Sequence, residues 1–91
     1  MGAEPIRNYV ITSHATLEME RRELDEAIVR SVLRAPEQRM AVRAGRDVLQ
    51  SRMPGAKAYL VRVFVDVDRN PAEVVTVYKT SKVAKYWEAD T

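Results

Sequence analysis

Side chains able to bind RNA gather near the end of the chain, in the segment TVYKTSKVAKYW at positions 76–87 and in the strand pattern before it. Lysine and arginine can neutralise phosphate groups, aromatic rings can stack on unpaired bases, and hydroxyl groups can bind phosphate oxygens. This combination of residue types suits the backbone and bases of a single RNA strand. The residues that supply it are Arg62, Tyr78, Thr80, Lys82, Lys85 and Tyr86.

A structural interpretation of the same residues stays open beside this one. Tyr78, Tyr86 and Trp87 would pack at the margin of a sheet. The lysines would keep a sheet edge soluble and prevent it from pairing with another chain, which is a common use of lysine at edges.

Cleavage of RNA without a metal is the reaction that such residues could support. A base activates the ribose 2′-hydroxyl, cations stabilise the crowded phosphate, and an acid protonates the leaving oxygen. His14 is the only histidine and falls in the first turn of an expected helix. The helix dipole there favours neutral imidazole, which fits a general base or a hydrogen-bonding role, and a partly buried neighbour of the helix cap is an equal alternative.

Composition argues against metal and cofactor chemistry. The chain has no cysteine and a single histidine, and its three glycines form no phosphate-binding loop. The carboxylates are scattered, so no ligand cluster has the spacing of a zinc or calcium site. We therefore expect no metal and no cofactor.

Length and composition indicate one folded domain. A chain of 91 residues with 46% hydrophobic and 31% charged residues can bury one core but cannot divide it. We expect a single domain over residues 1–91, with a flexible start at 1–8 and a frayed end at 88–91. No long apolar run is present, so we expect no membrane association and a cytoplasmic location.

Two helices are expected in the first half of the chain. Ser13 is the expected N-cap of the first, HATLEMERR, in which Ala15, Met19 and Arg22 share one stripe. Arg22 is expected to pair with Glu18, one turn earlier, because a buried arginine seldom lacks a partner. The second helix should run from an N-cap at residue 25 to residue 34, before a proline at 36.

Strands are expected in the second half, with a short one already at residues 8–12. Alternating patterns predict strands near 40–42, at 48–53, at 59–67 and at 73–80, separated by turns at 44–45, 54–55 and 68–72. The odd positions from Tyr59 to Val67 should face the core, and so should Val75 and Val77. Val74, Thr76, Tyr78 and Thr80 would then share the open face with Arg62 and Phe64. The fold class is α+β, with two helices on one face of a sheet of about four strands.

The chain also resembles a known family. The motif His-Ala-x3-Met-x2-Arg-x-Leu is matched by His14, Ala15, Met19, Arg22 and Leu24, and YLVRVFVD with VVTVYKTSKVAKYW completes the similarity. The pattern resembles a group of small uncharacterised domains placed beside the RelE and ParE toxins. The resemblance implies two helices packed on a curved antiparallel sheet and descent from metal-independent endoribonucleases of toxin–antitoxin pairs. It also places the tail as a turn at Thr80–Ser81 followed by a short basic edge strand.

The resemblance implies a set of functional residues as well. The catalytic residues would be His14, Arg62, Lys82 and Tyr86, and the substrate-binding residues Arg22, Tyr78 and Thr80. The chemistry of the tail adds Lys85 to the substrate-binding residues. The net charge of only +2 departs from the dense basic sheet of ribosome-dependent toxins, so ribosome binding is not implied.

Two other functions remain open on the same residues. One is a non-catalytic module that holds RNA, DNA or an acidic protein segment such as an antitoxin tail. The other is a homodimer formed through sheet edges or through a surface of Phe64, Tyr78 and Trp87.

Overall fold

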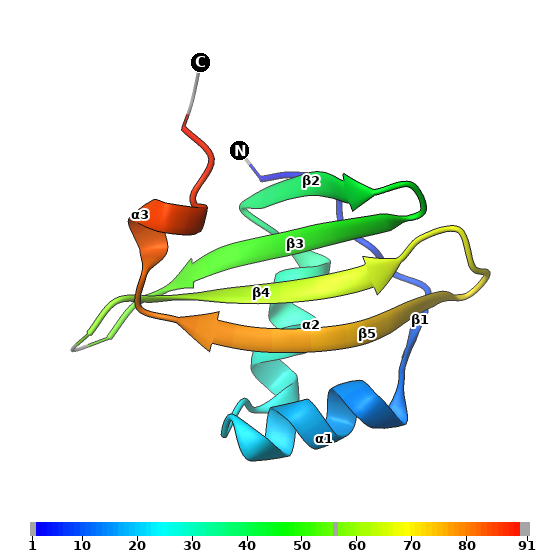
Figure 1. Cartoon of the computed structure of the whole chain (residues 1–91), viewed down its shortest axis with the longest axis horizontal. Coiled ribbons are helices and arrows are strands. Elements are labelled where there is room, and N and C mark those ends of the chain that lie inside the picture. Colours follow the sequence, from blue (N-terminus) through cyan, green and yellow to red (C-terminus); the bar gives the residue numbers. More distant parts are fainter. Residues whose placement is uncertain (1, 56, 90–91) are drawn as a thin grey trace.

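The computed structural model describes residues 2–55 and 57–89, which form a mixed five-stranded sheet with two helices behind it (Figure 1). The strand order is β1-β5-β4-β3-β2, and all neighbours are antiparallel except β1 and β5. The strands are β1 (Tyr9–Ile11), β2 (Gln38–Arg43), β3 (Arg46–Met53), β4 (Tyr59–Asp66) and β5 (Ala72–Thr80). The α+β class is confirmed. The sheet is larger than the expected four-stranded antiparallel one because β1 adds to β5 in parallel.

The helices are α1 (Ser13–Arg21), α2 (Glu26–Arg34) and the single turn α3 (Val83–Tyr86). Asp25 caps α2 as predicted, since its Oδ1 accepts a hydrogen bond from the backbone N–H of Ala27 at 3.0 Å. Ala35 leaves the helical conformation before Pro36, also as predicted.

The prediction that Ser13 caps α1 was wrong, because Thr12 is the cap. Thr12 is extended, and its Oγ1 accepts from the backbone N–H of Ala15 at 3.1 Å. The same hydroxyl donates to the backbone carbonyl of Val74 on β5 at 2.9 Å. Thr12 therefore fixes the start of α1 directly to the sheet, which a cap one residue later would not do.

The core lies between the sheet and the two helices α1 and α2. Val61, Val63 and Val65 on β4 are completely buried, as the odd-position pattern predicted, and they pack in one cluster with Val29 and Leu33 of α2. The opposite face of β4 carries Arg62, Phe64 and Asp66. Since α1 and α2 both lie behind or beside the sheet in Figure 1, neither covers this second face, and α3 packs on one end of it; we call it the open face.

A β-bulge reverses part of the predicted register on β5. Phe64 pairs with Thr76, but the next residue, Val65, pairs with Val74, so Val75 is the extra residue. Val74 is therefore buried in the core, and the prediction that it lies on the open face was wrong. Beyond the bulge, Tyr78 pairs with Arg62 as expected.

The C-terminal segment forms α3 rather than the expected edge strand. The first residues of β5 already pair with β1, and α1 packs against β5. After Ser81 the chain instead turns onto the open face, where the backbone N–H of Trp87 donates to the carbonyl of Val83 at 2.9 Å. This turn brings Tyr86 over β4.

The ends of the described chain are held by backbone and side-chain hydrogen bonds. The backbone N–H groups of Ala3 and Ile6 donate to the carbonyls of Pro36 and Leu33 at 2.8 and 3.0 Å. Glu88 is bonded to Gln38, and positions 90–91 of the expected frayed end lie outside the described residues. None of the helices in the described part of the chain is both long enough and apolar enough to cross a membrane.

Candidate functional site

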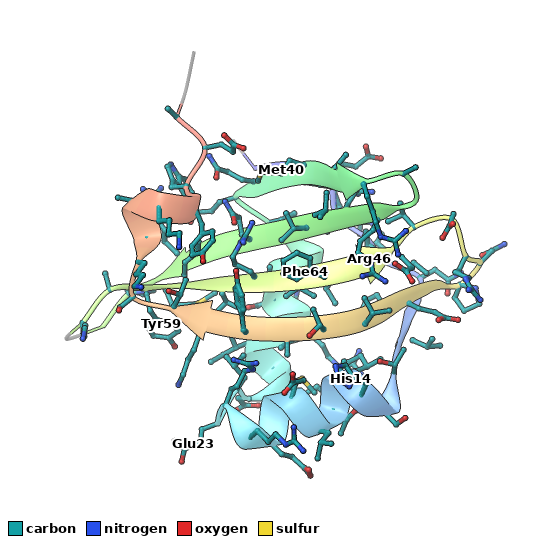
Figure 2. All side chains as sticks on the ribbon, in the orientation of Figure 1. His14, Glu23, Met40, Arg46, Tyr59 and Phe64 are labelled. Carbon is teal, nitrogen blue, oxygen red and sulfur yellow. The ribbon has the colours of Figure 1, made fainter. Side chains whose placement is uncertain are left out.

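The open sheet face has a polar centre formed by three neighbouring strands. The pairing places Gln50 of β3, Arg62 of β4 and Tyr78 of β5 side by side. Phe64 follows Arg62 by two residues and projects from the same face, away from α2 (Figure 2). Because side chains alternate between the two faces of β4, a cation and an aromatic ring lie next to each other on the same face.

Arg62 is the centre of this surface. Its Nε donates to Oε1 of Gln50 at 2.8 Å, and its Nη1 donates to the hydroxyl of Tyr78 at 2.7 Å. Its Cζ lies 4.5 Å from the ring centroid of Tyr86 and 5.3 Å from that of Phe64. Cation–π contacts of this kind contribute about 0.5–2 kcal/mol each, so the rings hold the guanidinium in place.

No carboxylate neutralises Arg62 within the described residues. The other two half-buried arginines both have one: Arg39 Nε lies 2.8 Å from Asp47 and Arg46 Nε lies 2.6 Å from Asp66. The hydrogen bond from Arg46 also lowers the pKa of Asp66, which keeps that carboxylate ionised. Arg62 has only neutral partners, so its positive charge is available to an anion from outside.

Gln50 connects Arg62 to the C-terminal segment. Its side chain is completely buried, and its Nε2 donates to Oε1 of Gln38 at 2.8 Å and to the backbone carbonyl of Tyr86 at 3.0 Å. Sequence reasoning missed this residue. The available signal was its position, because Gln50 alternates with the core residue Leu49 and so had to face the side of Arg62.

Residues 87–88 are held by β2 and β3. Gln38 Nε2 donates to the backbone carbonyl of Glu88 at 2.8 Å, and the N–H of Glu88 donates back to Gln38 Oε1 at 3.1 Å. The guanidinium of Arg52 lies 4.0 Å from the ring centroid of Trp87. The tail is therefore a fixed part of the open face, and it brings the ring of Tyr86 to Arg62.

His14 belongs to a second cluster on the rim formed by α1. Its side chain is 65% exposed, and its Nε2 lies 3.9 Å from Oε1 of Glu18. The same carboxylate oxygen lies 3.4 Å from Nη2 of Arg22, which confirms the predicted pair. Arg22 in turn lies 5.9 Å from the ring centroid of Tyr78. The connection from His14 to Arg62 therefore runs through Glu18, Arg22 and Tyr78.

The remaining predicted residues lie around the turn that leads into the tail. The backbone N–H of Lys82 donates to Oγ1 of Thr80 at 3.1 Å, so this hydroxyl has a local structural role. Lys82 and Lys85 are exposed, and Lys85 Nζ lies 5.3 Å from the ring centroid of Tyr86. The structure thus brings Arg62, Tyr78, Tyr86 and Lys85 together, with Arg22 at their margin, and leaves His14 and Lys82 farther out.

Within residues 2–55 and 57–89, no three His, Cys, Asp or Glu side chains are grouped closely enough to hold a metal ion. Comparison of the chain with protein families, with curated proteins and with solved structures gave no match. The chemistry of the open face is therefore the basis for assigning a function.

Proposed function

We propose that the chain is a RelE/ParE-like domain that binds single-stranded RNA on its open sheet face. One observation carries this proposal: Arg62 is half-buried, has no carboxylate partner in the described structure, and lies among the rings of Phe64, Tyr78 and Tyr86. A phosphate supplies the missing negative charge. The rings offer faces on which unpaired bases stack, each stack contributing about 1–3 kcal/mol.

The charges around Arg62 extend this surface. Lys82 and Lys85 lie on the tail side and Arg22 on the α1 side, so a strand crossing β4 meets a cation on either side of Arg62. Each phosphate contact on a single strand adds about 0.7 to the slope of log affinity against log salt. Contacts from Arg62, Lys82 and Lys85 together predict a slope of about −2.

Fluorescence anisotropy with a short labelled RNA, measured over a range of salt concentrations, tests this proposal. The double variant Lys82→Gln/Lys85→Gln removes exposed charges and is expected to fold normally. It should weaken binding several-fold and make the salt slope smaller by about 1.4. Arg21→Gln is the control, because it removes one exposed charge from the last turn of α1, outside both the open face and any other proposed binding site. Equal weakening by the control would show that the open face is not the RNA site.

Stacking is tested separately from charge. Phe64→Leu keeps an apolar side chain but removes one ring, and it should weaken RNA binding by at least fivefold if a base stacks there. Binding of double-stranded RNA should be much weaker than binding of the single strand, since paired bases cannot reach the rings. An acidic peptide that binds with the same dependence on Lys82 and Lys85 as RNA would favour an antitoxin-like partner instead.

Metal-independent RNA cleavage is a second candidate function, favoured by the rim cluster. His14 is exposed, and its Nε2 lies 3.9 Å from Oε1 of Glu18, so its imidazole can act as a base beside a carboxylate. In this reaction His14 takes the proton of a ribose 2′-hydroxyl, whose oxygen attacks the adjacent phosphorus. The P–O5′ bond breaks, the 5′-oxygen receives a proton, and the products are a 2′,3′-cyclic phosphate and a 5′-hydroxyl end.

A sequencing gel of single-stranded RNA incubated with the protein in EDTA tests the reaction. Discrete cuts that are lost in a folded His14→Gln variant would support it, and RNA binding should persist in that variant. RNA that is bound but not cut would refute cleavage of free RNA and leave the binding function in place.

A further inference from the structure

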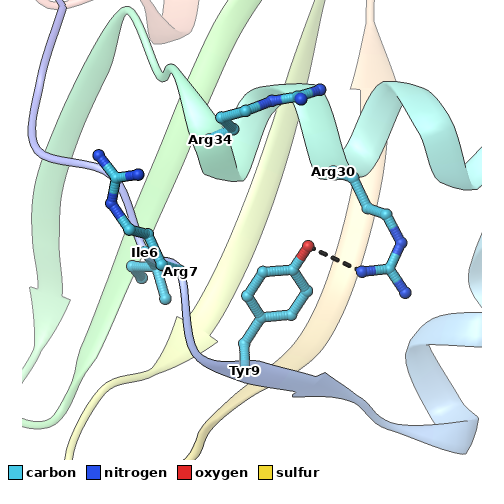
Figure 3. Close-up of a pocket in the computed structure, with 5 residues that line it drawn as sticks. All are labelled: Ile6, Arg7, Tyr9, Arg30 and Arg34. Carbon is cyan, nitrogen blue, oxygen red and sulfur yellow. Dashed lines mark hydrogen bonds between the residues drawn. The ribbon is translucent and has the colours of Figure 1, made fainter.

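A second arginine-rich site lies on the helical side of the molecule, away from the open face. The segment that leads into β1 passes beside α2 and leaves a cavity of about 330 Å³ between them. Its lining residues are Ile6, Arg7, Tyr9, Arg30 and Arg34 (Figure 3). Three of these five side chains carry a positive charge, and none carries a negative one.

Most of this charge is not neutralised. Arg30 is paired with Glu26, since its Nε lies 2.7 Å from the carboxylate. Arg7 and Arg34 are exposed, and neither forms an ion pair or a side-chain hydrogen bond within the described residues. Two guanidinium groups at one cavity therefore remain available, and each presents the forked donor geometry that matches phosphate and carboxylate oxygens.

Tyr9 provides a further donor at the same place. Its ring lies between β1 and α2, with the hydroxyl directed to Arg30, which donates to it from Nη1 at 3.0 Å (Figure 3). Because the hydroxyl oxygen accepts this bond, its own hydrogen is free to donate to a ligand. The ring of Tyr9 and the side chain of Ile6 form an apolar wall beside these donors.

From this arrangement we infer that the cavity binds a phosphate monoester carried on a planar or apolar group, such as a nucleoside monophosphate. A phosphate monoester has a charge of about −1.5 to −2 at neutral pH, which matches the two unpaired arginines. Figure 3 shows the guanidinium groups of Arg7 and Arg34 on different sides of Tyr9, so the phosphate is expected to lie between these two exposed side chains. The cavity is larger than a single phosphate group needs, so the wall formed by Ile6 and Tyr9 can receive the attached base or ring.

Isothermal titration calorimetry with AMP, inorganic phosphate and adenosine tests the inference. AMP should bind most tightly, inorganic phosphate more weakly and adenosine not measurably. Arg34→Gln should weaken AMP binding by about tenfold or more, because one charge-assisted contact is lost. The double variant Arg7→Gln/Arg34→Gln should abolish binding, and both variants should keep the wild-type melting temperature, since neither side chain has a partner to lose.

Arg21→Gln is the matched control, because Arg21 is an exposed arginine of α1 outside the cavity. Absence of AMP binding, equal loss of affinity in Arg21→Gln, or adenosine binding as tight as that of AMP would each overturn the inference. The Lys82→Gln/Lys85→Gln variant should bind AMP normally. Failure of the RNA proposal and failure of this one are thus distinguishable.

Discussion

Replacing Gln50 with leucine should detach the tail from the open face. The substitution removes the acceptor of Arg62 Nε and the donor to both Gln38 Oε1 and the Tyr86 carbonyl. A neutral hydrogen bond contributes about 0.5–1.5 kcal/mol and one to a charged group about 1.5–3 kcal/mol. Since burial of leucine returns part of this loss, we expect a net decrease of roughly 2–3 kcal/mol in the free energy of unfolding.

The melting temperature and the fluorescence of Trp87 test the effect of Gln50→Leu. For a domain of this size, the expected loss lowers the melting temperature by roughly 10–20 °C. Trp87 is the only tryptophan and lies on Arg52 at the end of the tail, so its fluorescence reports tail docking directly. In Gln50→Leu, acrylamide should quench Trp87 more strongly, while the far-ultraviolet circular dichroism of the folded protein stays unchanged.

The control for this experiment lies on the same face. Thr76→Val has nearly the same shape, and Thr76 makes no side-chain hydrogen bond within the described residues, so both its stability and its Trp87 quenching should be close to wild type. Gln38→Ala should give an intermediate effect, because it releases Glu88 but leaves the bond from Gln50 to Tyr86. A Gln50→Leu variant with wild-type quenching would refute the conclusion that this glutamine holds the tail.

Three further predictions test the fold and its charges. Thr12→Ala should cost about 1–2 kcal/mol of stability by chemical denaturation, because it removes the cap of α1, whereas Ser13→Ala should cost much less. Leu33→Ala should cost about 2–5 kcal/mol in the same assay, since this side chain is completely buried. Asp66→Asn should lower stability most at neutral pH. Arg46 lowers the pKa of Asp66 in the folded state. The stability that this ion pair contributes is therefore fully present above the unfolded pKa of about 3.9 and is lost as the pH falls through the folded pKa. The melting curves of the variant and the wild type should converge in acid.

Local sequence rules predicted the parts of the fold that local interactions determine. The cap at Asp25 and the end of α2 before Pro36 depend on residues a few positions apart, and the structure confirms both. The odd-position core of β4 follows from the period of two in the strand. Arg62 and Tyr78 came together for the same reason, since they occupy paired positions on neighbouring strands. Their role in binding stays a prediction.

Features that depend on distant contacts were not predictable in this way. The cap at Thr12 is fixed by a carbonyl on β5, and the bulge at Val75 is defined only by the pairing of β5 with β4. The tail has a strand-like composition, yet it forms a helical turn because Gln50 and Gln38 bind its backbone carbonyls. Gln50 and Gln38 lie 36 and 50 positions before the residues whose carbonyls they bind, so no local pattern could show the contact.

The partners of Arg62 explain why the open face differs from the rest of the surface. Arg39 and Arg46 show that this sheet pairs half-buried arginines with carboxylates elsewhere. At Arg62 the paired positions are occupied by Gln50 and Tyr78, which orient the guanidinium without cancelling its charge. An anion that binds there supplies the missing charge and stabilises the folded state by mass action. Arg7 and Arg34 at the cavity beside β1 also have no carboxylate partner within the described residues. Phosphate-bearing ligands that bind at either of these two sites should therefore raise the melting temperature.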